Sequence, residues 1–360
     1  MPPTCLSVAL RVAVSARSSH VIVTNNRGIL LRQRSFITTR LVRNKNKATM
    51  STSTPTSTST TPLVSCSVDE TKKIGTITLN SPQTLNALTI EMGKEFETLI
   101  TKLQHDLTST SDDDNNPNKD ISAIVLCGSG DKAFSSGGDM QWLRGLKNNS
   151  VHANVDIMMN FYNSFLCIRT KNLPVPIIAA IQGPAMGAGA CLALACDLRI
   201  ASASDADADA DSSTRTRTRT RTRPVLGFPF TKLGIPSGMG SIHLLQNVNK
   251  LSQSQVSEIL LLGKSLSGEE AYKLGLINKL VPHTQNVKDE AYNMALDIAT
   301  NHHPVAIRSM IRSIRLNVDE NKLIDSLYKD AHAQAMCYAR NDWGEGLHKA
   351  PPNFDNYHSK

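Results

Sequence analysis

The sequence has no acidic residue before position 69 and no uninterrupted apolar run of about 18 residues. The missing apolar run argues against a membrane-spanning helix, which needs about 20 such residues. The seven cysteines form no Cys-x-x-Cys pair and have no histidine at zinc-ligand spacing. They therefore predict buried free thiols in a reducing compartment, and neither a metal site nor a disulfide framework.

Charge is distributed unevenly along the chain. The 360 residues contain 39 Lys and Arg against 31 Asp and Glu, which gives a formal net charge of +8. Nine of the cations lie in residues 1–62, where there is no acid at all. The remainder has 30 cations and 31 acids, a net charge of −1. The net positive charge thus belongs to residues 1–62, and it gives no argument for a nucleic-acid partner.

Residues 1–48 have the Arg-rich, acid-free composition of a mitochondrial-type transit peptide. This predicts the mitochondrial matrix as the destination. Another organelle reached by a basic transit peptide, or a basic tail without a targeting role, remains an alternative. Residues 49–66 are rich in Ser and Thr and predict a disordered linker that cannot build a core.

A second low-complexity segment lies at residues 203–223. It alternates Asp with Ala and then Arg with Thr, so that four acids nearly cancel five arginines. No aromatic residue interleaves with the arginines to stack on bases. An inserted, solvated loop is therefore favoured over an RNA-binding tract, and no nucleic-acid partner is expected.

The body of the chain alternates strand and helix patterns, which predicts an α/β core with a mostly parallel sheet over residues 67–282. Beyond residue 241 the pattern is helical, and residues 283–360 are predicted to form a C-terminal helical region that buries some apolar faces against other subunits. The expected strands are 74–79, 121–126, 176–181 and 197–201, and the expected helices are 89–103, 156–170, 187–195, 241–248, 251–262, 267–274, 285–301, 304–315 and 319–338.

Two Gly-rich turns follow predicted strands and open predicted helices. They are FSSGGD at 134–139 and GPAMGAG at 183–189, and neither fits a dinucleotide-binding or P-loop pattern. A helix N-terminus presents free backbone N–H groups that favour an anion. Two such turns on sequential strands can direct two donors at one carbonyl oxygen, the arrangement that stabilises an enolate or a tetrahedral intermediate.

Five segments together resemble the crotonase superfamily of enoyl-CoA hydratases and isomerases. The resemblance spans about residues 67–355 and implies a spiral ββα core, assembly as a homotrimer or hexamer, and an acyl-CoA thioester as substrate with no separate cofactor. The segments are LNSPQTLNALTIEM at 79–92, AFSSGGDM at 133–140, PIIAAIQGPAMGAGACLALACDLRIAS at 176–202, LGFPFTKLGIPSGMGS at 226–241 and LSGEEAYKLGLINKLVP at 266–282.

The resemblance also assigns residues to roles. The family's backbone oxyanion hole falls on the N–H groups of Gly138 and Ala188. Its pantetheine and adenine contacts fall on Leu85, Asn86, Ala87, Leu88, Gly137, Asp139, Met140 and Gln141. Asp139 is expected to act mainly at the start of a helix.

The sequence departs from the family at the catalytic acids. The two hydratase glutamates fall at Cys191 and Phe230, and the glutamate of peroxisomal-type isomerases falls at Gly238. Because each lost acid or base costs about 10²–10⁴ in rate, ordinary two-glutamate hydration is disfavoured. We expect an acyl-CoA enzyme of the hydratase/isomerase group, a lyase or isomerase of fatty acid metabolism. A malonyl-type decarboxylase, an isomerase with an atypical acid or base, and a catalytically silent acyl-CoA-binding scaffold are the alternatives.

Overall fold

The computed structural model describes residues 12–13, 22–23, 61–109, 116–171, 173–203, 225–282, 285–316 and 320–340. The chain divides into two compact units, residues 1–59 and 60–360. In the first unit, β1 (Val12–Ala13) pairs antiparallel with β2 (Ile22–Val23). Most of the predicted transit peptide and nearly all of the 203–223 loop lie outside the described residues, so both stay predictions.

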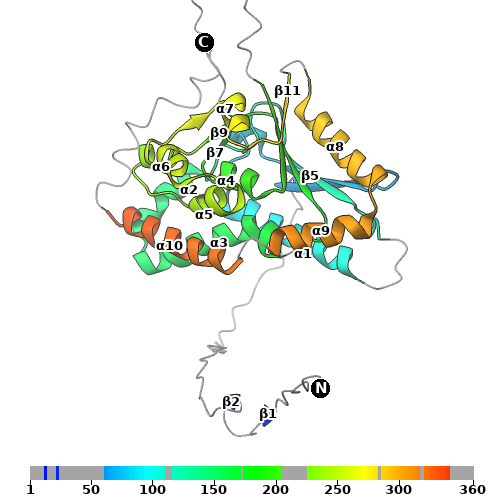
Figure 1. Ribbon diagram of the computed structural model, residues 1–360. Coiled ribbons are helices and arrows are strands. Elements are labelled where there is room, and N and C mark those ends of the chain that lie inside the picture. The colour runs from blue at the N-terminus through cyan, green and yellow to red at the C-terminus, as the bar shows by residue number, and fades with distance from the viewer. Residues whose placement is uncertain are drawn as a thin grey trace, which may run out of the picture. The chain divides into compact units, whose positions relative to one another are not determined.

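The second unit is built around a six-stranded sheet with the order β11-β8-β6-β5-β4-β3 (Figure 1). Strand β3 is antiparallel to β4, and every other neighbouring pair is parallel, which confirms the predicted sheet. The bounds are β3 Val64–Asp69, β4 Ile74–Leu79, β5 Ala123–Gly128, β6 Ile177–Ile181, β8 Leu198–Ser202 and β11 Lys279–Val281.

The first core strand corrects two predicted boundaries. Because β3 pairs with β4 along its whole length from Val64, residues 64–66 belong to the sheet and not to a disordered linker. The predicted linker of residues 49–66 and the predicted core start at residue 67 are both wrong by three residues. The Ser/Thr-rich composition concealed this strand, since Ser65 and Ser67 alternate with Cys66 and Val68.

A small sheet stands beside the large one. Its order is β10-β9-β7, with β7 parallel and β10 antiparallel to β9. Because β7 is followed within two residues by α4, this sheet fixes the entry into that helix. The bounds are β7 Ala185–Met186, β9 Leu226–Gly227 and β10 Ser265–Leu266.

The helices follow the predicted pattern with shifted ends. Helix α1 begins after Thr89, whose side chain accepts a hydrogen bond from the Met92 amide as an N-cap, and it continues five residues beyond the predicted end. The bounds are α1 Ile90–Thr108, α2 Met140–Gly145, α3 Val151–Thr170, α4 Ala188–Ala195, α5 Ser241–His243, α6 Gln253–Leu261, α7 Gly268–Lys273, α8 Val287–Asn301, α9 Pro304–Leu316 and α10 Glu320–Tyr338.

The predicted helix at 241–248 is not one regular α-helix. Helix α5 passes at Leu244 into a π-helix that ends at Val248. The Leu244 carbonyl accepts from both the backbone and the side-chain amide of Asn249, at 3.0 and 2.8 Å. This pair of bonds to a residue five positions later holds the widened turn.

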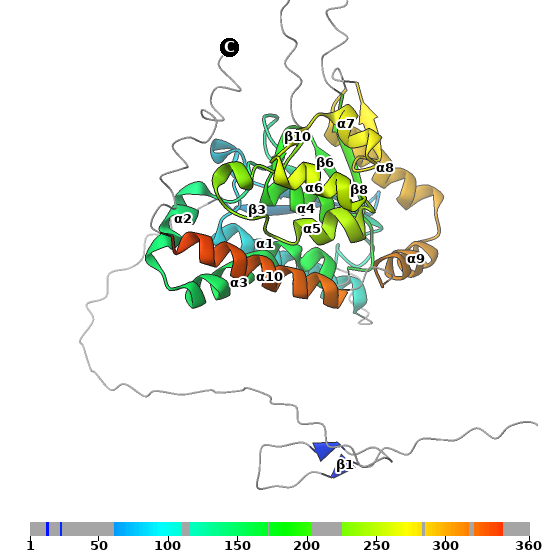
Figure 2. The same cartoon turned by 60° about the vertical axis from the view of Figure 1, so that its left-hand side comes forward.

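Different helices cover the two faces of the large sheet. One face buries Ile74, Val125, Ile178 and Ile200 against α8. The other face packs against α1, α3 and α4, and α10 lies along α3 (Figure 2). Helix α8, which the sequence assigned to the C-terminal helical region, is therefore a layer of the core, because its apolar residues cover one face of β4, β5, β6 and β8. Residues on both sides of the predicted boundary at 282/283 lie in one compact unit.

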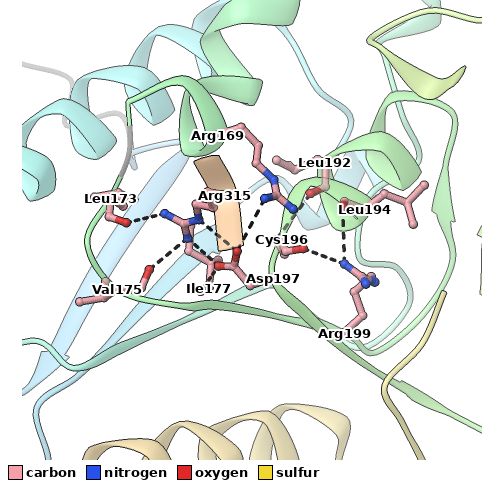
Figure 3. A network of polar contacts seen from close by, with 10 residues as sticks. All are labelled: Arg169, Leu173, Val175, Ile177, Leu192, Leu194, Cys196, Asp197, Arg199 and Arg315. Carbon is pink, nitrogen blue, oxygen red and sulfur yellow. Dashed lines mark hydrogen bonds and ion pairs between the residues drawn. The ribbon is translucent and has the colours of Figure 1, made fainter. Parts of the chain in front are cut away.

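A buried arginine cluster attaches α9 to this core (Figure 3). Arg315 of α9 pairs with Asp197 and donates to the backbone carbonyls of Leu173 and Val175. Asp197 also accepts from the Ile177 amide at 2.8 Å and lies 3.8 Å from Arg169. One carboxylate thus connects α9, α3 and the start of β6.

Candidate functional site

The two Gly-rich turns lie side by side because β5 and β6 are parallel neighbours. Ser135 of the first turn forms a parallel bridge with Ala185 of the second. The Met186 amide donates to the Ser135 carbonyl at 2.9 Å, and the Ser135 amide donates to the Pro184 carbonyl at 3.2 Å. These backbone bonds fix the relative position of the two turns, as the sequence predicted.

Gly137 brings the turns into close approach. Its φ of 98° lies in the region that disfavours side chains. A Cβ atom here would lie 2.5 Å from the Met186 carbonyl oxygen and 3.6 Å from the Ala188 nitrogen. Only glycine allows the backbone before Gly138 to pass this close to the first residue of α4.

The amides of Gly138 and Ala188 are left available by this arrangement. Gly138 pairs with Leu88 in an isolated bridge, but that bridge uses the Leu88 and Asp139 amides as donors, at 2.7 and 3.0 Å. Ala188 is the first residue of α4, so its N–H has no partner within the helix. Neither amide donates to an acceptor within the described residues, and both residues are half-buried.

The predicted substrate-contact segment at 85–88 borders the first turn. Leu85 is half-buried, whereas Asn86, Ala87 and Leu88 are buried. The Asn86 side chain accepts from the Ser81 amide and donates to the Ser129 and Ala133 carbonyls. Its amide group therefore holds the chain's own loops, and Leu85 is the residue of this segment that remains accessible.

The predicted contacts at 137–141 begin helix α2. Asp139 is its N-cap, and the carboxylate accepts from the Trp142 amide at 2.7 Å. This confirms the expected role at a helix start. Met140 is half-buried and Gln141 is exposed, so both lie at the accessible edge of the site.

Cys191, Phe230 and Gly238, the three positions to which the resemblance assigns acids, lie around the start of α4 and form what we call the wall. The Cys191 Sγ atom lies 3.6 Å from the Gly238 carbonyl oxygen. A Cβ on Gly187, next to Ala188, would lie 3.9 Å from the Phe230 ring. Burial raises the pKa of the Cys191 thiol far above its usual range, so the thiol stays neutral. This wall therefore carries no charge at residues 191, 230 and 238.

Aromatic and aliphatic side chains cover the other side of Gly138. A Cβ on that glycine would contact Leu143 at 3.4 Å and Phe161 at 3.9 Å. Phe161 packs against Trp142 with ring centroids 4.8 Å apart. The surroundings of the Gly138 amide are thus apolar, which strengthens any hydrogen bond made there.

Comparisons with known proteins agree with this architecture. The family model described as enoyl-CoA hydratase/isomerase matches residues 69–212 and 218–356. The chain belongs to the enoyl-CoA hydratase/isomerase family, within the crotonase superfamily. A short-chain-enoyl-CoA hydratase of Clostridium acetobutylicum is 24% identical over 279 residues, 76% of this chain and 90% of the relative.

Two further similarities cover most of the same region. A Dictyostelium discoideum protein named "Probable enoyl-CoA hydratase, mitochondrial" is 28% identical over 228 residues, 63% of this chain and 67% of the relative. The crystal structure of an enoyl-CoA hydratase from Bacillus halodurans aligns with a TM-score of 0.61 and 21% identity, over 80% of this chain and 99% of that one. That structural match establishes the crotonase-type fold.

Sequence reasoning missed four polar residues around Cys191 and Gly238. They are Tyr162 on α3 and Asp330, Gln334 and Tyr338 on α10, all buried. A signal was present, since the last three share one face of α10 with the buried residues Leu323 and Leu327. Polar residues within an otherwise apolar stripe indicate a specific buried partner.

Six cysteines of the described region are free, and four of these are buried, as predicted. No group of three or more His, Cys, Asp or Glu residues in the described ranges is placed to hold a metal ion. The described helices include none long and apolar enough to cross a membrane.

Proposed function

We propose that the protein binds an acyl-CoA thioester and polarises its carbonyl oxygen with the backbone N–H groups of Gly138 and Ala188. The observation that supports this is the adjacency of the two turns, which leaves both amides without an acceptor among the described residues. Two fixed donors in apolar surroundings stabilise the oxyanion of a developing enolate.

The substrate class follows from family membership, because the relatives are named for enoyl-CoA substrates. The CoA portion would contact Leu85 and the accessible start of α2 at Met140 and Gln141. Coenzyme A is then part of the substrate, and the proposed chemistry uses no other cofactor.

The absence of a carboxylate at positions 191, 230 and 238 favours a second candidate reaction, the decarboxylation of a malonyl-type thioester. Cys191, Phe230 and Gly238 supply no carboxylate for adding water to an enoyl double bond. In decarboxylation, the bond between the α-carbon and the carboxylate breaks and its electron pair enters the thioester enolate. Carbon dioxide leaves, and a proton then adds to the α-carbon. The two N–H donors are sufficient to hold that enolate.

We also propose that the protein acts as a homotrimer or hexamer in the mitochondrial matrix. Exposed apolar residues on α9 support an assembly that buries them, and these are Val305, Met310, Ile314 and Leu316. The leader composition and a relative with a mitochondrial name support the location.

The deciding experiment offers three thioesters to the purified protein that lacks the predicted transit peptide, residues 1–48. Crotonyl-CoA tests hydration, 3-hexenoyl-CoA tests isomerisation, and methylmalonyl-CoA tests decarboxylation, with products identified by mass. We expect turnover of at least one. Binding of all three without turnover would instead favour a silent scaffold. Absence of binding would overturn the oxyanion proposal itself.

A further inference from the structure

Helix α10 supplies part of the wall that carries the family's acid positions. A Cβ on Gly238 would lie 2.4 Å from the Gln334 Nε2 atom and 2.6 Å from the Tyr162 hydroxyl. The space in which an acidic side chain would begin at residue 238 is therefore filled by one group from α10 and one from α3. These two helices lie side by side (Figure 2).

The two groups that fill this space are fixed by hydrogen bonds. The Tyr162 hydroxyl donates to Gln334 Oε1 at 2.6 Å, and the Tyr338 hydroxyl donates to the same oxygen at 2.9 Å. Gln334 Nε2 donates to the Pro236 carbonyl at 2.9 Å. Segment 236–240, which passes in front of Cys191, is thus attached to α10 at its first residue.

Asp330 attaches the other end of the same segment. Its Oδ2 atom accepts from the Gly240 amide at 2.9 Å, and the residue is 7% exposed. One helical turn separates Asp330 from Gln334, so α10 holds the segment at two points. Gly238, between them, contacts the Cys191 thiol.

Two titratable groups interact with Asp330, Tyr162 on α3 and Cys191 on α4, and burial raises the pKa of both, so both stay neutral near pH 7. Tyr338 lies two turns further along α10, and burial raises its pKa as well. Helix α5, which packs against α10, carries His243, whose Nδ1 atom lies 3.2 Å from Asn247 Nδ2. No cation of the described residues forms an ion pair with Asp330.

We propose that Asp330 is a positioning residue of the acyl-CoA site, which holds segment 236–240 against Cys191 through the Gly240 amide while its carboxyl group is neutral, and releases the segment when that group is ionised. This inference rests on the proposed function for the identity of the ligand. A buried carboxylate without a cationic partner gains free energy from hydration, so ionisation favours an arrangement in which the segment moves away and water reaches Asp330. Ionisation therefore loosens the wall at Gly238.

Asp330 changes its ionisation state within the physiological pH range. Burial raises the pKa of Asp330 to about 7, although its hydrogen bond with Gly240 opposes the rise. The carboxylate is thus mostly protonated at pH 6 and mostly ionised at pH 8.5. Acyl-CoA binding is expected to weaken between these values.

The test compares the wild-type protein with Asp330→Asn, whose amide oxygen still accepts from Gly240 but does not ionise. Asp325→Asn is the matched control, because it removes the same charge from an exposed position on α10. The dissociation constant of crotonyl-CoA is measured from pH 6 to pH 8.5. We expect it to rise at least threefold more in the wild type and in Asp325→Asn than in Asp330→Asn.

A second measurement does not depend on the ligand. Hydrogen–deuterium exchange of segment 234–241 is compared between wild type and Asp330→Asn at each pH. Protection should fall through pH 7 in the wild type relative to the variant. Equal protection, or an equal pH dependence of binding, would overturn the role of Asp330. If crotonyl-CoA and the other two thioesters bind no variant while the protection differs, the acyl-CoA function fails, and Asp330 remains a structural contact only.

Discussion

Arg315 of α9 and Asp197, the residue before β8, form a buried ion pair in which Nη2 and Oδ2 lie 2.5 Å apart (Figure 3). Arg315 is 3% exposed, and its guanidinium also donates to two backbone carbonyls that precede β6. Each of the three guanidinium nitrogens therefore donates to an acceptor of the core. Arg308 adds a longer bond from α9 to the Lys119 carbonyl, at 3.3 Å, so Arg315 supplies most of the polar attachment of this helix among the described residues.

Replacing Arg315 with alanine should strongly destabilise the protein. Asp197 would keep Arg169 at 3.8 Å as its remaining cation, and the Leu173 and Val175 carbonyls would lose their donor. Removing one partner of a buried ion pair typically costs about 3–5 kcal/mol. Urea unfolding measures the loss, and Arg312→Ala, on an exposed position of the same helix, should change stability by less than about 0.5 kcal/mol. Similar effects of the two variants would contradict a dominant role for the ion pair.

The oxyanion proposal predicts a specific effect of Ala188→Pro. Proline lacks the N–H group but fits the first residue of a helix, so the fold should survive. Loss of one oxyanion donor should lower kcat by about 10²–10³ with whichever thioester is turned over. Gln253→Pro, at the exposed first position of α6, is the matched control and should keep full activity. Unchanged kcat in a folded Ala188→Pro variant would rule out this amide as a donor.

The packing around Gly238 predicts that substitutions at Gly238 and Gln334 have coupled effects on stability. A methyl group there would come within 2.4 Å of Gln334 Nε2 and 2.6 Å of Tyr162 Oη. Gly238→Ala should therefore destabilise by about 1–3 kcal/mol through overpacking. In the double variant with Gln334→Ala, part of that loss should be recovered, because the colliding amide is gone. Thermal or urea unfolding of the four-member cycle gives the coupling, and strictly additive effects would show that the two residues do not compete for space.

The raised pKa of Asp330 also predicts how stability depends on pH. The folded state, with a pKa of about 7, binds more protons than the unfolded state, with a pKa near 3.8. The contribution of Asp330 is thus complete below about pH 4 and is lost as the pH rises to about 7. At about 1.4 kcal/mol per pKa unit, the loss amounts to a few kcal/mol. The difference in unfolding free energy between wild type and Asp330→Asn should shift by this amount between pH 4 and pH 8, in favour of the variant. A constant difference would contradict the raised pKa.

Local pattern was enough to predict much of the fold and the central part of the candidate site. Ile74–Leu79 is a strand with the predicted ends, because alternating β-branched residues define it without help from distant contacts. The Gly137 and Gly187 turns were recognisable for a similar reason, since both glycines have a positive φ, which is a local property of the backbone.

Features that depend on distant partners were not predictable in the same way. Strand β3 is polar in composition, and its pairing with β4 reveals it. The wall at Gly238 depends on Gln334 and Asp330, whose roles become visible when α10 is packed on α3. A motif search restricted to residues 67–282 could not reach them.

The hydrogen bond between Tyr162 and Gln334 spans 172 residues of sequence. The backbone contacts that hold the two Gly-rich turns extend to Gly227, whose carbonyl accepts from the Gly187 amide. The wall at Gly238 also requires α10, which ends at Tyr338. The proposed oxyanion donors and this part of the wall therefore come from separate parts of the chain, so a substitution on α10 can reshape the wall while the contacts between the two turns remain.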